Sequence, residues 1–427
     1  MPSTADPGVI PVSHEHATGA AALEVAIRPA RAEVFMLSLP MVRTFRSAYG
    51  QSGGRKRLIV VRLEDQDGTP GWGEAPVAER PRYCTDTAES TWSALTGLLL
   101  PPLIGKSFAG PARVTDTWAD VMGQNYARNA VESAAWAIAS AKLDVALTRL
   151  WGGVRDAVDV GESFPICDTP PELLAEVGAR LEEGFGRVKL KIAPGWDVAA
   201  VRAVQQAFPG VPISVDANCG YSLDSGPWPE LDGLGLVMIE QPLAGDALIE
   251  MSQLQQALRT PLCLDESASS YNTTRTALRL GAGRIVNIKP PRLGGLLASM
   301  AVHDLCLREQ VPAWCGGTLE TGIGRGFNLA LASLPGFTLH SDMSPARLFY
   351  DQDLVEPTFD IRPDGTVAVP TQPGNGFPVV PERVAAAAIR RWSSDTRAAR
   401  SPGRGPGPGW PGRAVGAHAP PGDVTER

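Results

Sequence analysis

The chain lacks features that mark several classes of protein. Its net charge is −7 over 427 residues and its folded part carries no cluster of Lys and Arg, which argues against a nucleic-acid binder. No apolar run approaches the ~20 residues that cross a bilayer, so we expect no membrane span. Residues 1–22 lack a basic start followed by a continuous apolar core, so we also expect no secretion signal. These absences favour a cytoplasmic protein.

Common catalytic and redox motifs are missing as well. The sequence contains no GxGxxG with a following acidic residue, no Walker motif and no GxSxG, so nothing supports a nucleotide-binding enzyme or a serine hydrolase. Its six cysteines form no CxxC pair and show no zinc-like spacing. They are typical of reduced, mostly buried thiols in a cytosolic protein.

A regular spacing of charged residues is present instead. Lys191, Asp216, Glu240, Asp265 and Lys289 follow one another at intervals of 24 or 25 residues, and each of the last four ends a short apolar run. A strand, a helix and two loops take about this length, and such a period predicts a parallel sheet with right-handed crossovers. Strand ends of a (β/α)8 barrel open onto one face. The five charges are therefore expected to converge on one pocket.

The chain is longer than the ~250 residues of a barrel, so a second domain is expected. We predict a modified (β/α)7-8 TIM barrel over 151–349, preceded by an α+β capping domain over 26–150 that begins with a three-stranded antiparallel meander. Residues 350–390 are expected to return to the capping domain and complete it. Residues 1–25 lack periodic apolar positions and residues 391–427 are rich in Pro, Gly and Arg, so both are predicted to be disordered.

The strands of the barrel can be placed by their apolar runs. The first is predicted at 157–161, the second at 187–192, the seventh at 311–315 and the eighth at 337–340. Amphipathic helices are predicted between them.

The carboxylates of Asp216, Glu240 and Asp265 predict a metal site. Like charges on neighbouring strand ends repel unless a cation lies among them, and hard oxygen ligands suit octahedral Mg²⁺. A single such residue would more often cap a helix or pair with an Arg, but three in register with the barrel period favour the ion. Mn²⁺ is expected to substitute.

Two lysines of one strand and one of a later strand complete the predicted site. Lys189 and Lys191 are two residues apart, so both point into the barrel, while Lys289 lies roughly opposite. Burial beside a metal and another cation is expected to lower the ammonium pKa, which suits a general base. Two bases on opposite faces of a carbon, with a divalent ion beyond, can remove a proton α to a carboxylate and form an enediolate.

Several loop residues have two open interpretations. The segments 43–50 and 74–84 are either ordinary surface connections or lids over the site. Asn218 and Glu266 either hydrogen-bond the lysines and the metal ligands or cap helices. Backbone N–H groups after the seventh strand are candidates for binding a substrate carboxylate, and Glu320 there either is structural or lines the pocket.

The motifs resemble the muconate-lactonising subgroup of the enolase superfamily, in the branch of o-succinylbenzoate synthases and N-succinylamino acid (N-acylamino acid) racemases. The resemblance covers roughly 32–380. It rests on the stretches Arg187-Val-Lys-Leu-Lys-Ile-Ala-Pro-Gly-Trp-Asp197, Val215-Asp-Ala-Asn218, Met238-Ile-Glu-Gln-Pro-Leu243, Cys263-Leu-Asp-Glu-Ser267, Val286-Asn-Ile-Lys-Pro290 and Trp314 to Arg325.

The resemblance implies that Lys191 and Lys289 are the acid/base pair, that Lys189 supports Lys191 and that loops 43–50 and 74–84 close over the substrate. A synthase would dehydrate 2-succinyl-6-hydroxy-2,4-cyclohexadiene-1-carboxylate in menaquinone biosynthesis, and a racemase would act on N-succinyl amino acids. We expect a small carboxylate substrate and a homo-oligomer. The residues expected to bind the substrate are Arg46, Tyr49, Ser163, Gly316, Gly317, Thr318 and Glu320.

Other functions on the same fold remain open. The same lysines and carboxylates serve dipeptide epimerases and muconate cycloisomerases, and Pro165, Pro291 and Thr318 differ from the residues usual in the branch near the substrate end. A non-catalytic scaffolding relative is a further alternative. The intact lysines count against it, because lysines are costly to bury without a role.

Overall fold

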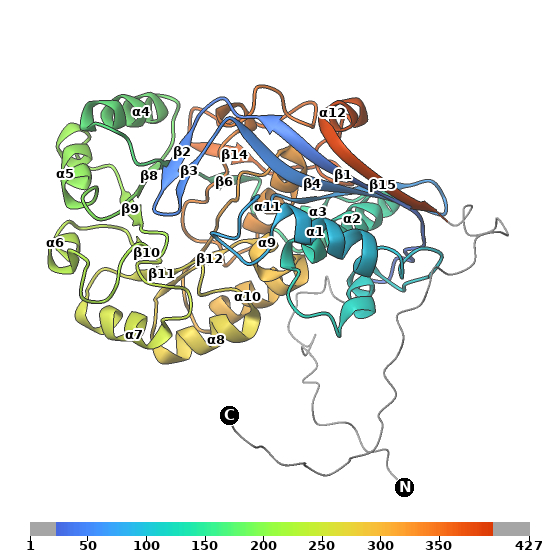
Figure 1. Cartoon of the computed structure of the whole chain (residues 1–427), viewed down its shortest axis with the longest axis horizontal. Coiled ribbons are helices and arrows are strands. Elements are labelled where there is room, and N and C mark those ends of the chain that lie inside the picture. The colour runs from blue at the N-terminus through green and yellow to red at the C-terminus, as the bar shows by residue number, and fades with distance from the viewer. Residues whose placement is uncertain (1–22, 396–427) are drawn as a thin grey trace, which may run out of the picture.

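A computed structural model describes residues 23–395 of the chain. Two sheets dominate it, a four-stranded antiparallel sheet in the cap and a seven-stranded parallel sheet that curls into a barrel (Figure 1). Within the described range no helix is long and apolar enough to cross a membrane.

The cap sheet joins the two ends of the described chain. Its strand order is β15-β1-β4-β5, and all neighbours are antiparallel. The predicted meander is β1, β4 and β5, and β15 adds a fourth strand beside β1. The strands are β1 (Pro29–Pro40), β4 (Arg55–Asp65), β5 (Pro70–Ala75) and β15 (Ala388–Asp395).

Helix α2 (Asn125–Leu143) packs against this sheet through β5, and the sequence of β5 explains how closely it can approach. A Cβ atom on Gly73 would lie 1.8 Å from the backbone oxygen of Ala130, and one on Gly71 would lie 2.0 Å from that of Ala134. Only glycine fits there, which places the α2 backbone directly on the strand. The other cap helices are α1 (Ala88–Ala94), a π-helical turn (Leu95–Leu99), a 3-10 helix (Pro111–Trp118) and α3 (Leu147–Leu150).

The hairpin of β2 (Phe45–Ser47) and β3 (Gly50–Ser52) extends from the cap toward the barrel. The backbone N–H of Ile166, just past the first barrel strand, donates to the oxygen of Arg46 at 2.9 Å. This hairpin is the segment 43–50 for which the sequence left open a lid or a surface connection, and it lies against the barrel.

The barrel sheet has the order expected from the 24- to 25-residue period, with consecutive strands adjacent and parallel. The modified TIM barrel with an N-terminal cap is thereby confirmed. Its strands are β7 (Gly161–Phe164), β8 (Arg187–Lys191), β9 (Ile213–Asp216), β10 (Ile239–Glu240), β11 (Leu262–Leu264), β12 (Ile285–Ile288) and β13 (Ala313–Cys315). Helices follow the strands around the outside: α4 (Pro170–Glu182), α5 (Val198–Ala207), α6 (Trp228–Asp232), α7 (Leu248–Ala257), α8 (Tyr271–Leu280), α9 (Pro290–Leu293), α10 (Leu296–Arg308) and α11 (Gly322–Ala332).

Two predicted barrel strands differ from the structure. Residues 157–159 form β6 (Ala157–Asp159), which pairs antiparallel with β14 (Thr366–Ala368), and the first barrel strand starts only at Gly161. The prediction placed the first barrel strand too early because β6 ends only two residues before β7 begins, and the apolar run at 157–161 extends from one strand into the other. At the predicted eighth strand, 337–340, the described chain makes only isolated parallel bridges, Ala313 to Phe337 and Val160 to Ser341.

The C-terminal segment runs back over both domains. After a 3-10 turn (Ala346–Leu348), β14 pairs with β6, and α12 (Pro381–Ala387) leads into β15. Strand β15 continues to Asp395, so the first five residues of the predicted disordered tail are in the cap sheet, and the rest of that tail lies outside the described residues. The predicted N-terminal extension, 1–25, also lies mostly outside them.

Candidate active site

Three carboxylates meet where β9, β10 and β11 end. Asp216 and Glu240 are the last residues of their strands, and Asp265 directly follows its strand. One carboxylate oxygen from each lies within 4.8 Å of the other two, and all three side chains are buried. Burial, followed by the charge of Asp216, raises the pKa of Glu240 to about 8. Three hard oxygen donors that repel one another in a buried site fit a divalent cation such as Mg²⁺.

Lysines approach this triad from two directions. The Nζ of Lys191, at the end of β8, lies 2.6 Å from Oδ2 of Asp216 and 2.8 Å from Oδ1 of Asn218. Nζ of Lys289, just past β12, lies 2.7 Å from Oδ2 of Asp265. Both lysines line one cavity of about 200 Å³ between barrel and cap. The strands that carry them are separated by β9, β10 and β11, so the two ammonium groups face the cavity from different sides.

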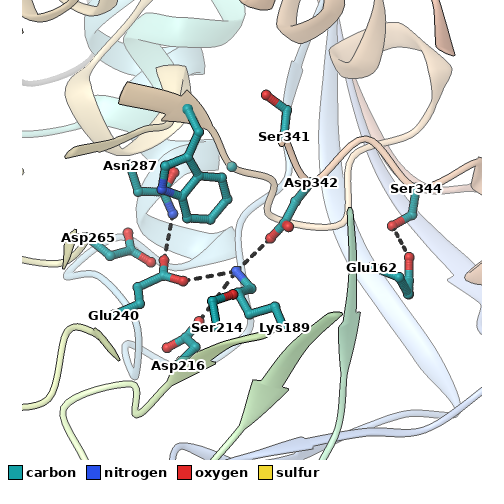
Figure 2. A network of polar contacts seen from close by, with 12 residues as sticks. Glu162, Lys189, Ser214, Asp216, Glu240, Asp265, Asn287, Ser341, Asp342 and Ser344 are labelled. Atoms are coloured by element: carbon teal, nitrogen blue, oxygen red, sulfur yellow. Dashed lines mark hydrogen bonds and ion pairs between the residues drawn. The ribbon is translucent and has the colours of Figure 1, made fainter. Parts of the chain in front are cut away.

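Lys189 lies deeper and is held by a carboxylate that sequence reasoning missed. Its Nζ is 2.6 Å from Oδ2 of Asp342, 3.0 Å from Oε2 of Glu240 and 3.6 Å from Oδ2 of Asp216 (Figure 2). The ring of Trp314 lies on its other side, with Nζ 4.6 Å from the centroid. Asp342 also pairs with Arg187.

Neighbouring carboxylates raise the pKa values of two buried lysines. Burial alone would lower the pKa of Lys189, but Asp342, Glu240 and Asp216 raise it more, so the net pKa lies above its ordinary value. Lys289 behaves in the same way, because Asp265 and Glu240 outweigh its burial. The lowered pKa expected of a lysine beside a metal ion stays a prediction.

Asp265 has two further partners that were not predicted. The hydroxyl of Tyr83 donates to its Oδ1 at 2.6 Å, and the guanidinium of Arg292 contacts the same oxygen. Lys289 and Arg292 hold the pKa of Asp265 well below its usual range against the effect of its burial. Tyr83 belongs to the segment 74–84, which brings the cap to the triad. Arg292 is three residues past Lys289 in α9, a helical spacing that could have been used to find it.

Glu266 joins the hairpin to the barrel. Its Oε1 accepts from the hydroxyl of Tyr49 at 2.7 Å and from Nδ2 of Asn218 at 3.2 Å. Burial, followed by the charges of Asp265 and Asp216, raises its pKa to about 7. Asn218 therefore contacts Lys191 through one side of its amide and Glu266 through the other, while Glu266 makes no hydrogen bond to a lysine among the described residues.

The residues expected to bind the substrate divide into two groups. Tyr49, Ser163, Gly317 and Thr318 line the cavity. Arg46 does not: its guanidinium turns to the barrel rim and donates to the oxygens of Ile166 and Cys167 and to Asp168. These three contacts fasten the hairpin to the barrel rim, and substrate binding by Arg46 stays a prediction.

Two residues of the turn after β13 support the cavity without lining it. Glu320 is buried, accepts from the backbone and hydroxyl of Thr318 at 2.9 and 2.8 Å, and lies 3.3 Å from Arg325. Gly316 lies against Lys289: a Cβ at position 316 would lie 2.5 Å from Cε of that lysine. A larger residue at 316 would displace that side chain.

Comparisons with known proteins agree with this geometry. Family models match twice, the mandelate racemase/muconate lactonizing enzyme N-terminal domain over 30–152 and an enolase C-terminal domain-like model over 172–383. The chain is 39% identical over 344 residues to an o-succinylbenzoate synthase of Geobacillus kaustophilus, covering 80% of this chain and 91% of that protein. It is 40% identical over 352 residues to an N-succinylamino acid racemase of an Amycolatopsis species, covering 82% and 95%. A solved structure of a probable mandelate racemase from Alicyclobacillus acidocaldarius superposes with a TM-score of 0.79 at 35% identity, covering 86% and 100%.

Proposed function

The chain belongs to the mandelate racemase/muconate lactonizing enzyme family of the enolase superfamily, and from this premise we propose that it is an o-succinylbenzoate synthase, an N-succinylamino acid racemase, or both. The shared reaction is removal of a proton α to a carboxylate, which gives an enediolate. Relatives of both activities resemble this chain at nearly equal identity, so the proposal keeps both.

The observation that carries the proposal is the placement of Lys191 and Lys289. Both line the same cavity, from strands on opposite sides of β10, and each lies within 2.7 Å of a carboxylate of the triad. A substrate between them presents one face of its α-carbon to each lysine. Lys191 removes the proton in the synthase reaction, and Lys289 stabilises the enediolate as hydroxide leaves. In racemisation the two exchange roles, one removing the proton and the other returning it to the opposite face.

Asp216, Glu240 and Asp265 are the residues that would hold a Mg²⁺ ion, with Mn²⁺ as a substitute. Such an ion supplies positive charge that favours the enediolate over the neutral substrate. Lys189 also lines the cavity and contacts Glu240 and Asp216, so we propose that it holds these two carboxylates in place, while Asn218 orients Lys191. Tyr49, Ser163, Gly317 and Thr318 are proposed to contact the substrate.

Dipeptide epimerisation and muconate cycloisomerisation would use the same lysines and carboxylates, so the test must span substrates. The protein is incubated in deuterated water with Mg²⁺ and N-succinyl amino acids, and α-proton exchange is followed by NMR; the cyclohexadiene carboxylate is assayed for dehydration. Exchange or dehydration with either succinyl substrate is expected. Turnover of dipeptides or muconate, with neither exchange of the N-succinyl amino acids nor dehydration of the cyclohexadiene carboxylate, would contradict the proposal.

The lysine roles have their own test. Lys191→Ala is expected to lower exchange by at least ~10²- to 10⁴-fold, the usual contribution of a positioned base, with an unchanged unfolding curve. Lys106→Ala removes an exposed lysine of the cap and serves as the matched control. Wild-type rates in Lys191→Ala would overturn the assignment.

We also propose a cytoplasmic location. All six cysteines lie in the described range and all are free thiols, which fits a reducing compartment. Assembly into a homo-oligomer stays a prediction that light scattering can test.

A further inference from the structure

The cap contributes a lysine to the cavity, in addition to the lysines of the barrel. Lys56, at the start of β4 in the cap, lines the same space as Lys191 and Lys289. Its Nζ donates to the backbone oxygen of Pro76 at 2.9 Å. In the described part of the chain no carboxylate lies within 4.0 Å of it. Lys56 thus differs from Lys189, Lys191 and Lys289, each of which is paired with at least one carboxylate.

The acidic groups near Lys56 do not neutralise it. Its ionisable neighbours are Glu320, Glu74 and Cys84. Glu320 is compensated by Arg325 and by two hydrogen bonds from Thr318. Burial raises the pKa of Glu74 to about 8, so this carboxyl is mostly protonated at neutral pH. Arg80 also lines the cavity from the cap, so the cap side of the cavity keeps a net positive charge.

A half-buried ammonium group with one neutral partner is unfavourable in the absence of an anion. Burial lowers the pKa of Lys56, because the charged form is less favourable there than in water. A carboxylate placed beside it would restore a charge-assisted hydrogen bond of the strong kind. Aromatic and apolar side chains also line the cavity, among them Tyr83, Tyr126, Leu319 and Phe349. The cavity thus suits a molecule with an anion at each end and a largely apolar middle.

We propose that Lys56 binds a second carboxylate of the substrate, the one at the free end of a succinyl group, and so selects succinyl substrates. This inference rests on the proposed function. The names of the two kinds of relative, o-succinylbenzoate synthase and N-succinylamino acid racemase, both contain a succinyl group. Recognition of that shared part by one cap residue explains how one cavity serves both reactions: the barrel contacts the reacting carboxylate, and the cap contacts the distal one.

The experiment compares each N-succinyl amino acid with its succinamoyl analogue, in which an amide of the same shape replaces the distal carboxylate. Lys56→Gln is expected to lower kcat/KM for the succinyl substrate by ~10- to 100-fold, mainly through KM, and to leave the succinamoyl substrate nearly unchanged. Lys56→Arg should keep most of the preference. Arg57→Gln is the matched control, because Arg57 lies next in β4, pairs with Glu79 and does not line the cavity.

An equal loss of kcat/KM on the succinyl and succinamoyl substrates would show that Lys56 has a structural role alone. An unchanged kcat/KM on both substrates would also refute the inference. Calorimetry with o-succinylbenzoate and its succinamide analogue tests the same contact without turnover. If the wild type binds o-succinylbenzoate through Lys56 but catalyses neither succinyl reaction, the proposed function fails and the contact stands. If the wild type and Lys56→Gln bind o-succinylbenzoate equally, or neither binds it, the contact is refuted.

Discussion

Asp342 is expected to control the metal affinity of a site that it does not itself form. It lies 2.6 Å from Nζ of Lys189, closer than Glu240 at 3.0 Å or Asp216 at 3.6 Å. In Asp342→Asn the ammonium group loses its nearest anion, so it is drawn onto the Glu240 and Asp216 oxygens that are proposed to hold the ion. Lys189 then competes with the metal for its ligands.

The size of the effect follows from the geometry. Two charges about 4 Å apart interact by ~4 kcal/mol at an effective dielectric constant of about 20, and rearrangement of Lys189 and Arg187 recovers part of this. Loss of a partner that supports metal ligands usually weakens metal binding by ~10- to 100-fold, or ~1.4 to 3 kcal/mol. We expect a rise of this size in the Kd for Mg²⁺, measured by calorimetry.

The control for Asp342→Asn is the same change in an exposed carboxylate. Asp360 is exposed and pairs with Arg347 at the surface, so Asp360→Asn should bind Mg²⁺ like the wild type. A folded Asp342→Asn variant with wild-type or tighter affinity would refute the reasoning, because it would show that Lys189 does not compete with the metal.

Two further predictions concern stability. Glu74 accepts N–H groups of Thr321 and Gly324 and has a pKa raised by burial to about 8, so the native state keeps a proton that the unfolded chain loses near pH 4.5. Its contribution to the free energy of unfolding is present at acidic pH and is lost as the pH rises toward 8. The free energy of unfolding, measured by urea titration at pH 5 and pH 8, should therefore change less between the two pH values in Glu74→Gln than in the wild type. An undiminished change in Glu74→Gln would exclude Glu74 as a source of this pH dependence. Gly73→Ala should destabilise the protein by ~3 kcal/mol or more, because its Cβ would lie 1.8 Å from a backbone oxygen of α2. Gly97→Ala is the control and should be near neutral, because the space around Gly97 is open. Equal melting temperatures of the two variants would contradict this packing.

The sequence predicted those parts of the site that repeat with the barrel period. Asp216, Glu240, Asp265 and Lys289 each end or follow an apolar strand, and the parallel pairing of β9 to β12 brings them to one edge. Alternation along β8 places Lys189 and Lys191 on the same side, where both reach Asp216. Periodicity was sufficient here because strand order followed chain order.

Residues outside that period could not be placed in the same way. Asp342 follows a segment that makes only isolated bridges, so no strand pattern indicated that it faces Lys189. Tyr83 comes from a cap connection without regular structure, and its contact with Asp265 depends on how the two domains pack. The contacts of Arg46 with the barrel rim could not be predicted for a related reason: a hairpin residue can face the cavity or the rim, and composition does not decide between them.

The pairing of β1 with β15 has a consequence for how the protein is made. Nearly the whole chain lies between these two strands, so β1 emerges from the ribosome long before its second neighbour exists. Until then one edge of β1 has no hydrogen-bonding partner, which is the kind of edge that recruits other chains. Closing so long a loop is slow compared with forming the βα units in between. The barrel can therefore assemble during synthesis, while the cap that covers Lys191 and Lys289 is completed last.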